Sequence, residues 1–225
     1  MKGTDAVATD PLETDAAATD TVTAGPQTIR PLDDYRDRLA EAGGPKAKLE
    51  IIAPKAILNL RGRADDPGFA EAVRATFGLA LPTEPNRCHS ADADDQAAAE
   101  VISWLGPDEW LVMAEAGTEE AFEASLRTAR PDDPWLAITD LSHTYTGLRL
   151  SGILARDILA SGCPLDLHPR VFGVDHCAQT MLAKARVFLR QISVEPAFEI
   201  WVRNSFVRYL ADWLVDAAGL AITET

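Results

Sequence analysis

The chain has 225 residues with 35 acidic and 21 basic side chains, a formal net charge of −14, and 47% hydrophobic residues, which predicts one large domain or two small ones. The acidic excess argues against a nucleic-acid partner, and no apolar run approaches the roughly 18 residues of a membrane span. The N-terminus lacks a signal-peptide layout and the three cysteines are too few for a disulfide framework, so we expect a cytoplasmic protein without a membrane partner.

Residues 1 to about 27 differ in composition from the rest of the chain. Thr, Asp and Ala recur there, large apolar side chains are nearly missing, and the charged residues are one base and five acids: Lys2, Asp5, Asp10, Glu13, Asp15 and Asp20. Such a segment cannot offset the entropy of ordering itself. A short helix over 32–42 follows, before a break at residues 43–45. We therefore assign 1–45 to a disordered acidic tail and linker, and 46–220 to the folded domain.

Strands and helices alternate over residues 55–140. Asp66 followed by Pro67 is typical of a helix start, and Gly78 of a helix end. Between them, large apolar residues recur every four positions on one face: Phe69, Val73 and Phe77. A second helix is predicted to start at Thr118, with Phe122 and Leu126 facing inward. The predicted strands of this part are 56–60, 101–105, 110–113 and 135–140, the middle two forming a hairpin.

Residues 141–219 repeat this order. The predicted strands are 145–150, 180–183, 187–192 and 198–202, with a helix over 153–161. A final helix runs from Ser205 to a predicted end at Gly219. Its apolar stripe comprises Phe206, Leu210, Trp213, Leu214 and Ala217.

Both halves thus give the order strand, helix, strand pair, helix. This order is typical of the split βαβ, ferredoxin-like unit, in which helices cover one face of a mostly antiparallel sheet. We predict an α+β fold made of two such halves, with pseudo-repeats at about 55–140 and 141–219.

The common catalytic and cofactor motifs are missing from the sequence. It contains no glycine-rich phosphate loop, no G-x-S-x-G nucleophile elbow and no C-x-x-C pair. Asp140, Ser142 and His143 imitate a catalytic triad, but triads are assembled from separate segments. A local turn bond between Asp140 and Ser142 is therefore the better interpretation. We predict no catalytic residue in this chain.

The densest group of polar residues lies between residues 163 and 179. The candidates for a loop that contacts a ligand or a partner are Cys163, Asp166, His168, Cys177 and Gln179, with His176 beside them. Their spacing matches no standard zinc site, and Pro164 and Pro169 favour a rigid loop. A metal site, a ligand or partner contact, and a scaffolding role all stay open.

Basic residues are concentrated in the second half. Between residues 141 and 210 five acids accompany eight bases: Arg149, Arg156, Arg170, Lys184, Arg186, Arg190, Arg203 and Arg208. A basic face on an acidic protein can dock an acidic partner or an anionic small molecule. Solvated arginines on strand edges would give the same pattern.

Several of these stretches resemble a known family, the γ subunit of heterotetrameric sarcosine oxidase. The resemblance covers about 48–218 and is carried by residues 140–143, 156–169, 176–180, 198–206 and 209–214. Its most specific part is the string Cys163-Pro164-Leu165-Asp166-Leu167-His168-Pro169. The acidic tail lies outside the part that resembles the family.

The resemblance implies a subunit of an αβγδ complex that oxidises sarcosine to glycine, with oxygen as acceptor and tetrahydrofolate receiving the one-carbon unit. In such complexes FAD, FMN and NAD belong to the α and β chains, and zinc to the δ chain. The γ chain is similar in fold to the folate-binding part of the glycine-cleavage aminomethyltransferase. The resemblance therefore implies that this chain is a non-catalytic scaffold in contact with the α chain.

Two alternatives to the sarcosine oxidase subunit stay open. The first is the equivalent subunit of a complex that oxidises N-methylglutamate or another N-methyl amino acid. The second is a free folate-binding protein. Folate-binding relatives carry a Gly-Cys-Tyr-x-Gly-Gln string, of which Cys177 and Gln179 are kept here while the glycines are absent.

Overall fold

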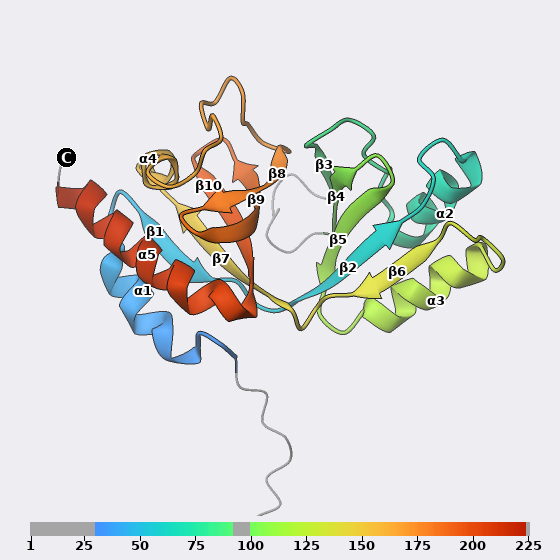
Figure 1. Cartoon of the computed structure of the whole chain (residues 1–225), viewed down its shortest axis with the longest axis horizontal. Helices are drawn as coiled ribbons and strands as arrows, with labels where there is room; N and C mark the ends of the chain where they lie inside the picture. The colour runs from blue at the N-terminus through green and yellow to red at the C-terminus, as the bar shows by residue number, and fades with distance from the viewer. Residues whose placement is uncertain (1–29, 92–99, 224–225) are drawn as a thin grey trace, which may run out of the picture.

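A computed structural model describes residues 30–91 and 100–223. Within this part, ten strands form two antiparallel sheets of five (Figure 1). The first sheet has the order β3 (Cys88–Ser90), β4 (Val101–Gly106), β5 (Glu109–Glu115), β2 (Lys55–Arg61) and β6 (Ala137–Asp140). The second has the order β1 (Lys48–Ile51), β7 (Tyr145–Ser151), β10 (Ala197–Arg203), β9 (Ala185–Ser193) and β8 (Cys177–Leu182). The predicted α+β class with two sheet-forming halves is confirmed.

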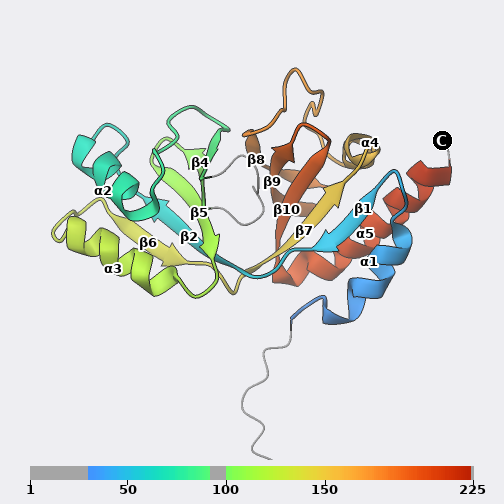
Figure 2. The ribbon, with the colours of Figure 1, turned by 180° about the vertical axis from the view of Figure 1, so that it is seen from behind.

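Helices cover the outer face of each sheet (Figures 1 and 2). The first sheet carries α2 (Pro67–Phe77) and α3 (Glu119–Ala129). The second carries the 3-10 turn η1 (Asp33–Tyr35), α1 (Arg36–Ala42), α4 (Ala155–Ala160) and α5 (Asn204–Thr223). No helix in the described part of the chain is long and apolar enough to cross a membrane.

Three clusters of buried residues hold these layers together. One lies between the first sheet and its helices, and a larger one between the second sheet and its helices. A third cluster joins the inner faces of the two sheets and comprises Ile57, Cys88, Val101, Leu111, Met113, Cys177, Phe188 and Trp201. The molecule is therefore layered helix, sheet, sheet, helix, and its inner faces meet.

The cap signals of α2 are present as predicted. Asp66 accepts a hydrogen bond from the Gly68 amide at 2.8 Å, and Gly78 ends the helix with a left-handed φ of 69°. Phe69, Val73 and Phe77 are all buried. Helix α2 is therefore specified almost entirely by its own residues.

Helix α5 departs from the prediction in two ways. It continues through Gly219 to Thr223, so the predicted end is wrong. Its buried side chains are Val207, Leu210, Ala211, Leu214 and Ala218. Phe206 is instead 48% exposed, because the 100° step between helical residues aligns Val207 with Leu210 and Leu214.

The second sheet takes its edge strand, β1, from the part of the chain that precedes the first half. β1 leads directly into β2 but pairs with β7, with Leu49 opposite Leu150. β6 leads directly into β7 but pairs with β2. The chain thus crosses between the sheets twice, at 52–54 and 141–144, which ties the halves into one body.

The segment assigned to tail and linker contributes to the fold. Leu32 and Leu39 are each 1% exposed and belong to the core of the second sheet. The short helix predicted over 32–42 is present as η1 and α1. The predicted tail over 1–27 lies outside the described residues.

Candidate functional site

The polar residues of the predicted loop are mostly used in local bonds. The Asp166 side chain accepts from the His168 amide at 2.9 Å, and His168 Nδ1 accepts from the Arg170 amide at 3.2 Å. The Cys163 sulfur is buried, 3.9 Å from Thr180 Oγ1. These contacts fix the turn between α4 and β8.

Strand β8 places the other two candidates on a different surface. Cys177, Gln179 and Met181 alternate with Ala178 and Leu182, which pack against the helices. Cys177 faces the first sheet and is fully buried, whereas Gln179 is exposed and lines a groove between the sheets. The structure therefore does not bring the five candidates into one site.

Asp140 and Ser142 form the predicted local turn. The Ser142 hydroxyl and amide both donate to Asp140 Oδ1, at 2.5 and 2.8 Å, and the hydroxyl accepts from the Ile57 amide at 2.9 Å. Burial opposes ionisation of Asp140, but the two bonds from Ser142 outweigh it and lower the pKa of this carboxyl. This group stabilises the crossing between β6 and β7.

Two matching tripeptides, Asn86-Arg87-Cys88 and Asp175-His176-Cys177, pair with each other where the halves touch. The Cys88 amide donates to the Asp175 carbonyl and the Cys177 amide donates to the Asn86 carbonyl, each at 2.9 Å. Asn86 and Asp175 have left-handed φ angles of 60° and 63°. Hydrogen bonding with the Cys88 sulfur and burial raise the pKa of the Cys177 thiol. The cysteines therefore sit in a structural joint, and the matching role of Cys88 was not foreseen.

A buried ion cluster lies on the inner face of the second sheet. Glu199 accepts from Arg190 Nε at 2.8 Å, from Arg149 at 3.3 Å and from Trp201 Nε1 at 3.3 Å. The side chains of Glu199 and Arg190 are only 2% and 4% exposed. Because both oxygens of the Glu199 carboxylate accept hydrogen bonds from neighbouring side chains, we interpret this cluster as structural.

The inter-sheet groove is a cavity of about 690 Å³ with walls from both sheets and from α5. The cations on its walls are Lys184, Arg186 and Arg203, and the guanidinium of Arg203 lies 5.3 Å from the centre of the Tyr145 ring. Its one carboxylate, Glu109, accepts from Asn59 at 2.8 Å. Apolar walls with a few convergent polar groups are typical of binding sites.

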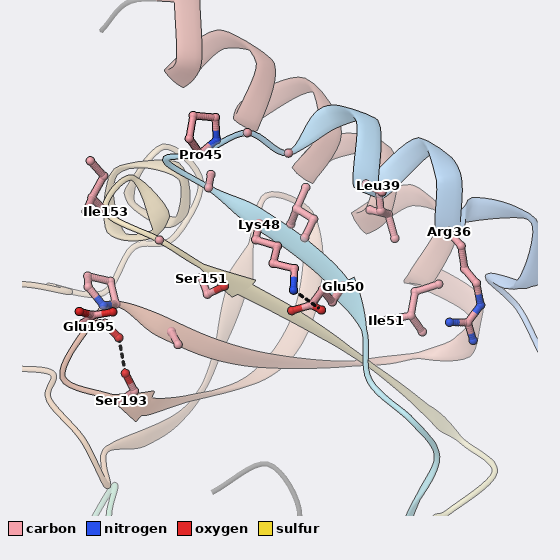
Figure 3. Close-up of a pocket in the computed structure, with 18 residues that line it drawn as sticks. Arg36, Leu39, Pro45, Lys48, Glu50, Ile51, Ser151, Ile153, Ser193 and Glu195 are labelled. Carbon is pink, nitrogen blue, oxygen red and sulfur yellow. Dashed lines mark hydrogen bonds and ion pairs between the residues drawn. The ribbon is translucent and has the colours of Figure 1, made fainter. Parts of the chain in front are cut away.

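A second hollow, of about 960 Å³, lies between α1, β1 and the turn that joins β9 and β10 (Figure 3). Its polar groups include two bonded pairs. Lys48 pairs with Glu50 at 2.8 Å, and the Ser193 hydroxyl donates to the Glu195 carbonyl at 2.6 Å. The groove, with its cluster of cations, is the stronger candidate site.

A family model described as the sarcosine oxidase gamma subunit family matches residues 61–220. The chain belongs to this family. The resemblance found in the sequence is thereby confirmed.

Curated relatives agree with this assignment. The gamma subunit of sarcosine oxidase from Corynebacterium sp. strain P-1 is 42% identical over 170 residues, covering 76% of this chain and 79% of the relative. The gamma subunit from Corynebacterium sp. strain U-96 is 36% identical over 179 residues, covering 79% of this chain and 82% of the relative.

Solved structures give the same result for the fold. A chain of the heterotetrameric sarcosine oxidase from Corynebacterium sp. U-96, in complex with pyrrole 2-carboxylate, matches with a TM-score of 0.75 and 30% identity. The match covers 86% of this chain and 95% of that one. The glycine cleavage system aminomethyltransferase T from Bartonella henselae shares the fold, with a TM-score of 0.57, 19% identity, and coverage of 82% of this chain and 51% of that one.

Proposed function

We propose that this chain is the gamma subunit of a heterotetrameric sarcosine oxidase and acts there as a non-catalytic scaffold. The observation that carries the proposal is the match to a chain of such an enzyme, which covers 95% of that chain at 30% identity. Its partners would be the alpha, beta and delta subunits, with alpha as the direct contact.

The scaffold role is supported by how the polar residues are used. Asp166 and His168 bond backbone amides of their own loop, Ser142 bonds Asp140, and Glu199 is held by two arginines. Side chains committed to such bonds maintain a shape. Catalysis instead requires a nucleophile or base aimed at a substrate position.

The complex would oxidise sarcosine to glycine with oxygen as acceptor and pass the one-carbon unit to tetrahydrofolate. We assign FAD, FMN and NAD to the alpha and beta chains and zinc to the delta chain. We further propose a cytoplasmic location, supported by three cysteines that are all unpaired thiols.

Co-expression tests the proposal. Affinity purification through a tag on this chain is expected to recover the other three subunits in equal amounts, with sarcosine-dependent peroxide formation in the eluate. Activity on N-methylglutamate but not on sarcosine would assign the complex to the alternative substrate. Recovery of this chain alone would contradict the proposal.

A further inference from the structure

Large apolar side chains stand exposed at the edge of the groove. Met181 on β8 and Phe206 and Tyr209 on α5 are 40%, 48% and 39% exposed. Met181 and Phe206 line the groove, and Tyr209 is linked to it because its hydroxyl accepts from the Lys184 amide at 3.2 Å. We call these three residues the apolar rim. It extends the groove onto the outer surface of α5.

The cations of the groove lack acidic partners. Lys184, Arg186 and Arg203 form no ion pair with any described residue, although the chain carries an excess of acids. Several exposed arginines elsewhere pair with carboxylates, as Arg127 does with Glu123 at 2.8 Å. Three unpaired cations around one groove leave a local positive field in an acidic molecule.

The carboxylate inside the groove does not cancel this field. Glu109 already accepts from Asn59 at 2.8 Å and lies 3.8 Å from Arg61, which also pairs with Asp108 at 3.0 Å. These groups belong to the first sheet, on the wall opposite Arg186. The uncompensated positive charge therefore lies on the second sheet, next to the apolar rim.

We propose that the groove and its apolar rim dock an acidic segment of a partner subunit, with one apolar or aromatic side chain inserted between Met181 and Phe206. This inference rests on the proposed function and names the surface it uses. Aromatic residues, methionine and arginine are the types enriched at protein interfaces. Carboxylates of the segment would pair with Arg186, Lys184 and Arg203.

The extent of the surface favours a polypeptide over a small molecule. Tyr209 lies outside the cavity, and Phe206 is about half exposed, so a ligand confined to the groove would leave much of the apolar rim in water. A segment that also crosses the start of α5 would cover it. Because the groove has walls from both sheets, such a segment would brace the two halves against each other.

Matched variants test the surface in the co-expressed complex. The test variants are Arg186→Glu and Phe206→Ser. The controls are the same substitutions at exposed residues outside the groove: Arg170→Glu and Ile153→Ser, the latter side chain being 68% exposed. The affinity of each purified variant for the complex of the other subunits is measured, and thermal unfolding checks that each variant folds.

Each test variant is expected to lose affinity by about tenfold or more, the range of interface hot spots, and each control to stay within about twofold. Added salt should weaken binding of the wild type more than binding of Arg186→Glu, because salt screens the charge pairs that the wild type makes and the variant lacks. Equal affinities for all four variants would overturn the inference while leaving the proposed function intact. Failure of the wild type to assemble would contradict the proposed function itself.

Two other occupants would also be detected. If the isolated chain is a dimer that Arg186→Glu dissociates, the surface belongs to a second copy and the inference is wrong. If calorimetry shows that tetrahydrofolate binds the isolated chain and that both test variants lose this binding without losing assembly, the groove is a small-molecule site and the inference is again wrong.

Discussion

Glu199 carries its charge on the inner face of the second sheet, almost without contact with solvent. Arg190 and Arg149 donate to its two oxygens, and Trp201 adds a third bond. Desolvating these ions is expensive, so their attraction does not make the cluster a large net source of stability. Removing one partner is different, because it leaves a buried charge uncompensated.

Glu199→Ala is therefore expected to lower the free energy of unfolding by about 3–5 kcal/mol. The matched control is Glu71→Ala, which removes an exposed glutamate paired with Arg74 at 2.7 Å and should change stability little. Urea unfolding followed by tryptophan fluorescence measures both. Similar small losses for the two variants would contradict the structural role of the cluster.

The cysteines give a second prediction for single residues. Cys177 is fully buried and Cys88 is 2% exposed, and the pKa of the Cys177 thiol is raised. Burial keeps both side chains from solvent, and the raised pKa also keeps Cys177 in the less reactive thiol form, so a thiol reagent in mildly alkaline buffer should modify neither residue in the native chain. After unfolding both should react, as mass spectrometry of labelled peptides would show. Rapid native labelling of Cys177 would contradict the buried joint.

Among the elements, α2 and α3 are coupled through one arginine. Arg130 follows α3 and pairs both with Asp66, the N-cap of α2, and with Asp133 in the next turn. The Trp135 amide and Arg130 lower the pKa of Asp133. A carboxyl with a lowered pKa in the folded state stabilises the fold above its ordinary pKa of 3.8, and this contribution is lost as the pH falls through the folded-state value.

Asp133→Asn is accordingly expected to be less stable than the wild type at neutral pH, and the gap should close as the pH falls below 3.8. Chemical denaturation at a series of pH values measures it. Asp132→Asn, the neighbouring exposed aspartate, is the control. A gap between wild type and Asp133→Asn that is constant with pH would show that the charge of Asp133 is not what stabilises the turn.

Elements with local signals were predictable and elements held by distant partners were not. α2 carries its own cap and stop, and the hairpin of β4 and β5 carries its turn residues. β1 is only four residues long, with Lys48 and Glu50 alternating with Leu49 and Ile51. It becomes a strand because β7 pairs with it. The predicted end at Gly219 was wrong because Ala221 and Ile222, beyond the glycine, pack against the core of the second sheet, and this packing outweighs the roughly 1 kcal/mol cost of a helical glycine.

A chain that starts at Lys55 tests the importance of β1. It would leave β7 as an open edge and remove Leu32, Leu39 and Leu49 from the core. We expect such a chain to unfold or aggregate, whereas a chain that starts at Arg30 keeps β1 and should unfold cooperatively. Circular dichroism and gel filtration compare the two. Equal stability would contradict the proposed contribution of β1 to the stability of the second sheet.

At the scale of the molecule, the candidate site is formed by both halves of the chain. The sequence identified the basic second half and Gln179, but the groove also needs Asn59 and Glu109 from the first half. Their approach depends on how the inner faces of the sheets meet, which no local pattern encodes. The outward direction of Phe206 likewise depends on which face of α5 the second sheet covers.

The same layering fits the scaffold role that we propose for this chain. Helices occupy the outer faces, the inner faces are joined by the third core cluster, and the groove opens where that cluster ends. A rigid body of this kind offers a partner a fixed surface. In the proposed complex, its contribution to the reaction would be the position that it gives to the neighbouring subunits.

The most direct measurement of this account is the subunit composition of the oxidase purified with and without this chain. With it, we predict one copy of each of the four subunits and sarcosine-dependent peroxide formation; without it, the other three should be recovered incompletely or with reduced activity. A fully active complex of the remaining three subunits in normal proportions, or sarcosine oxidation by the isolated chain, would contradict the central claim.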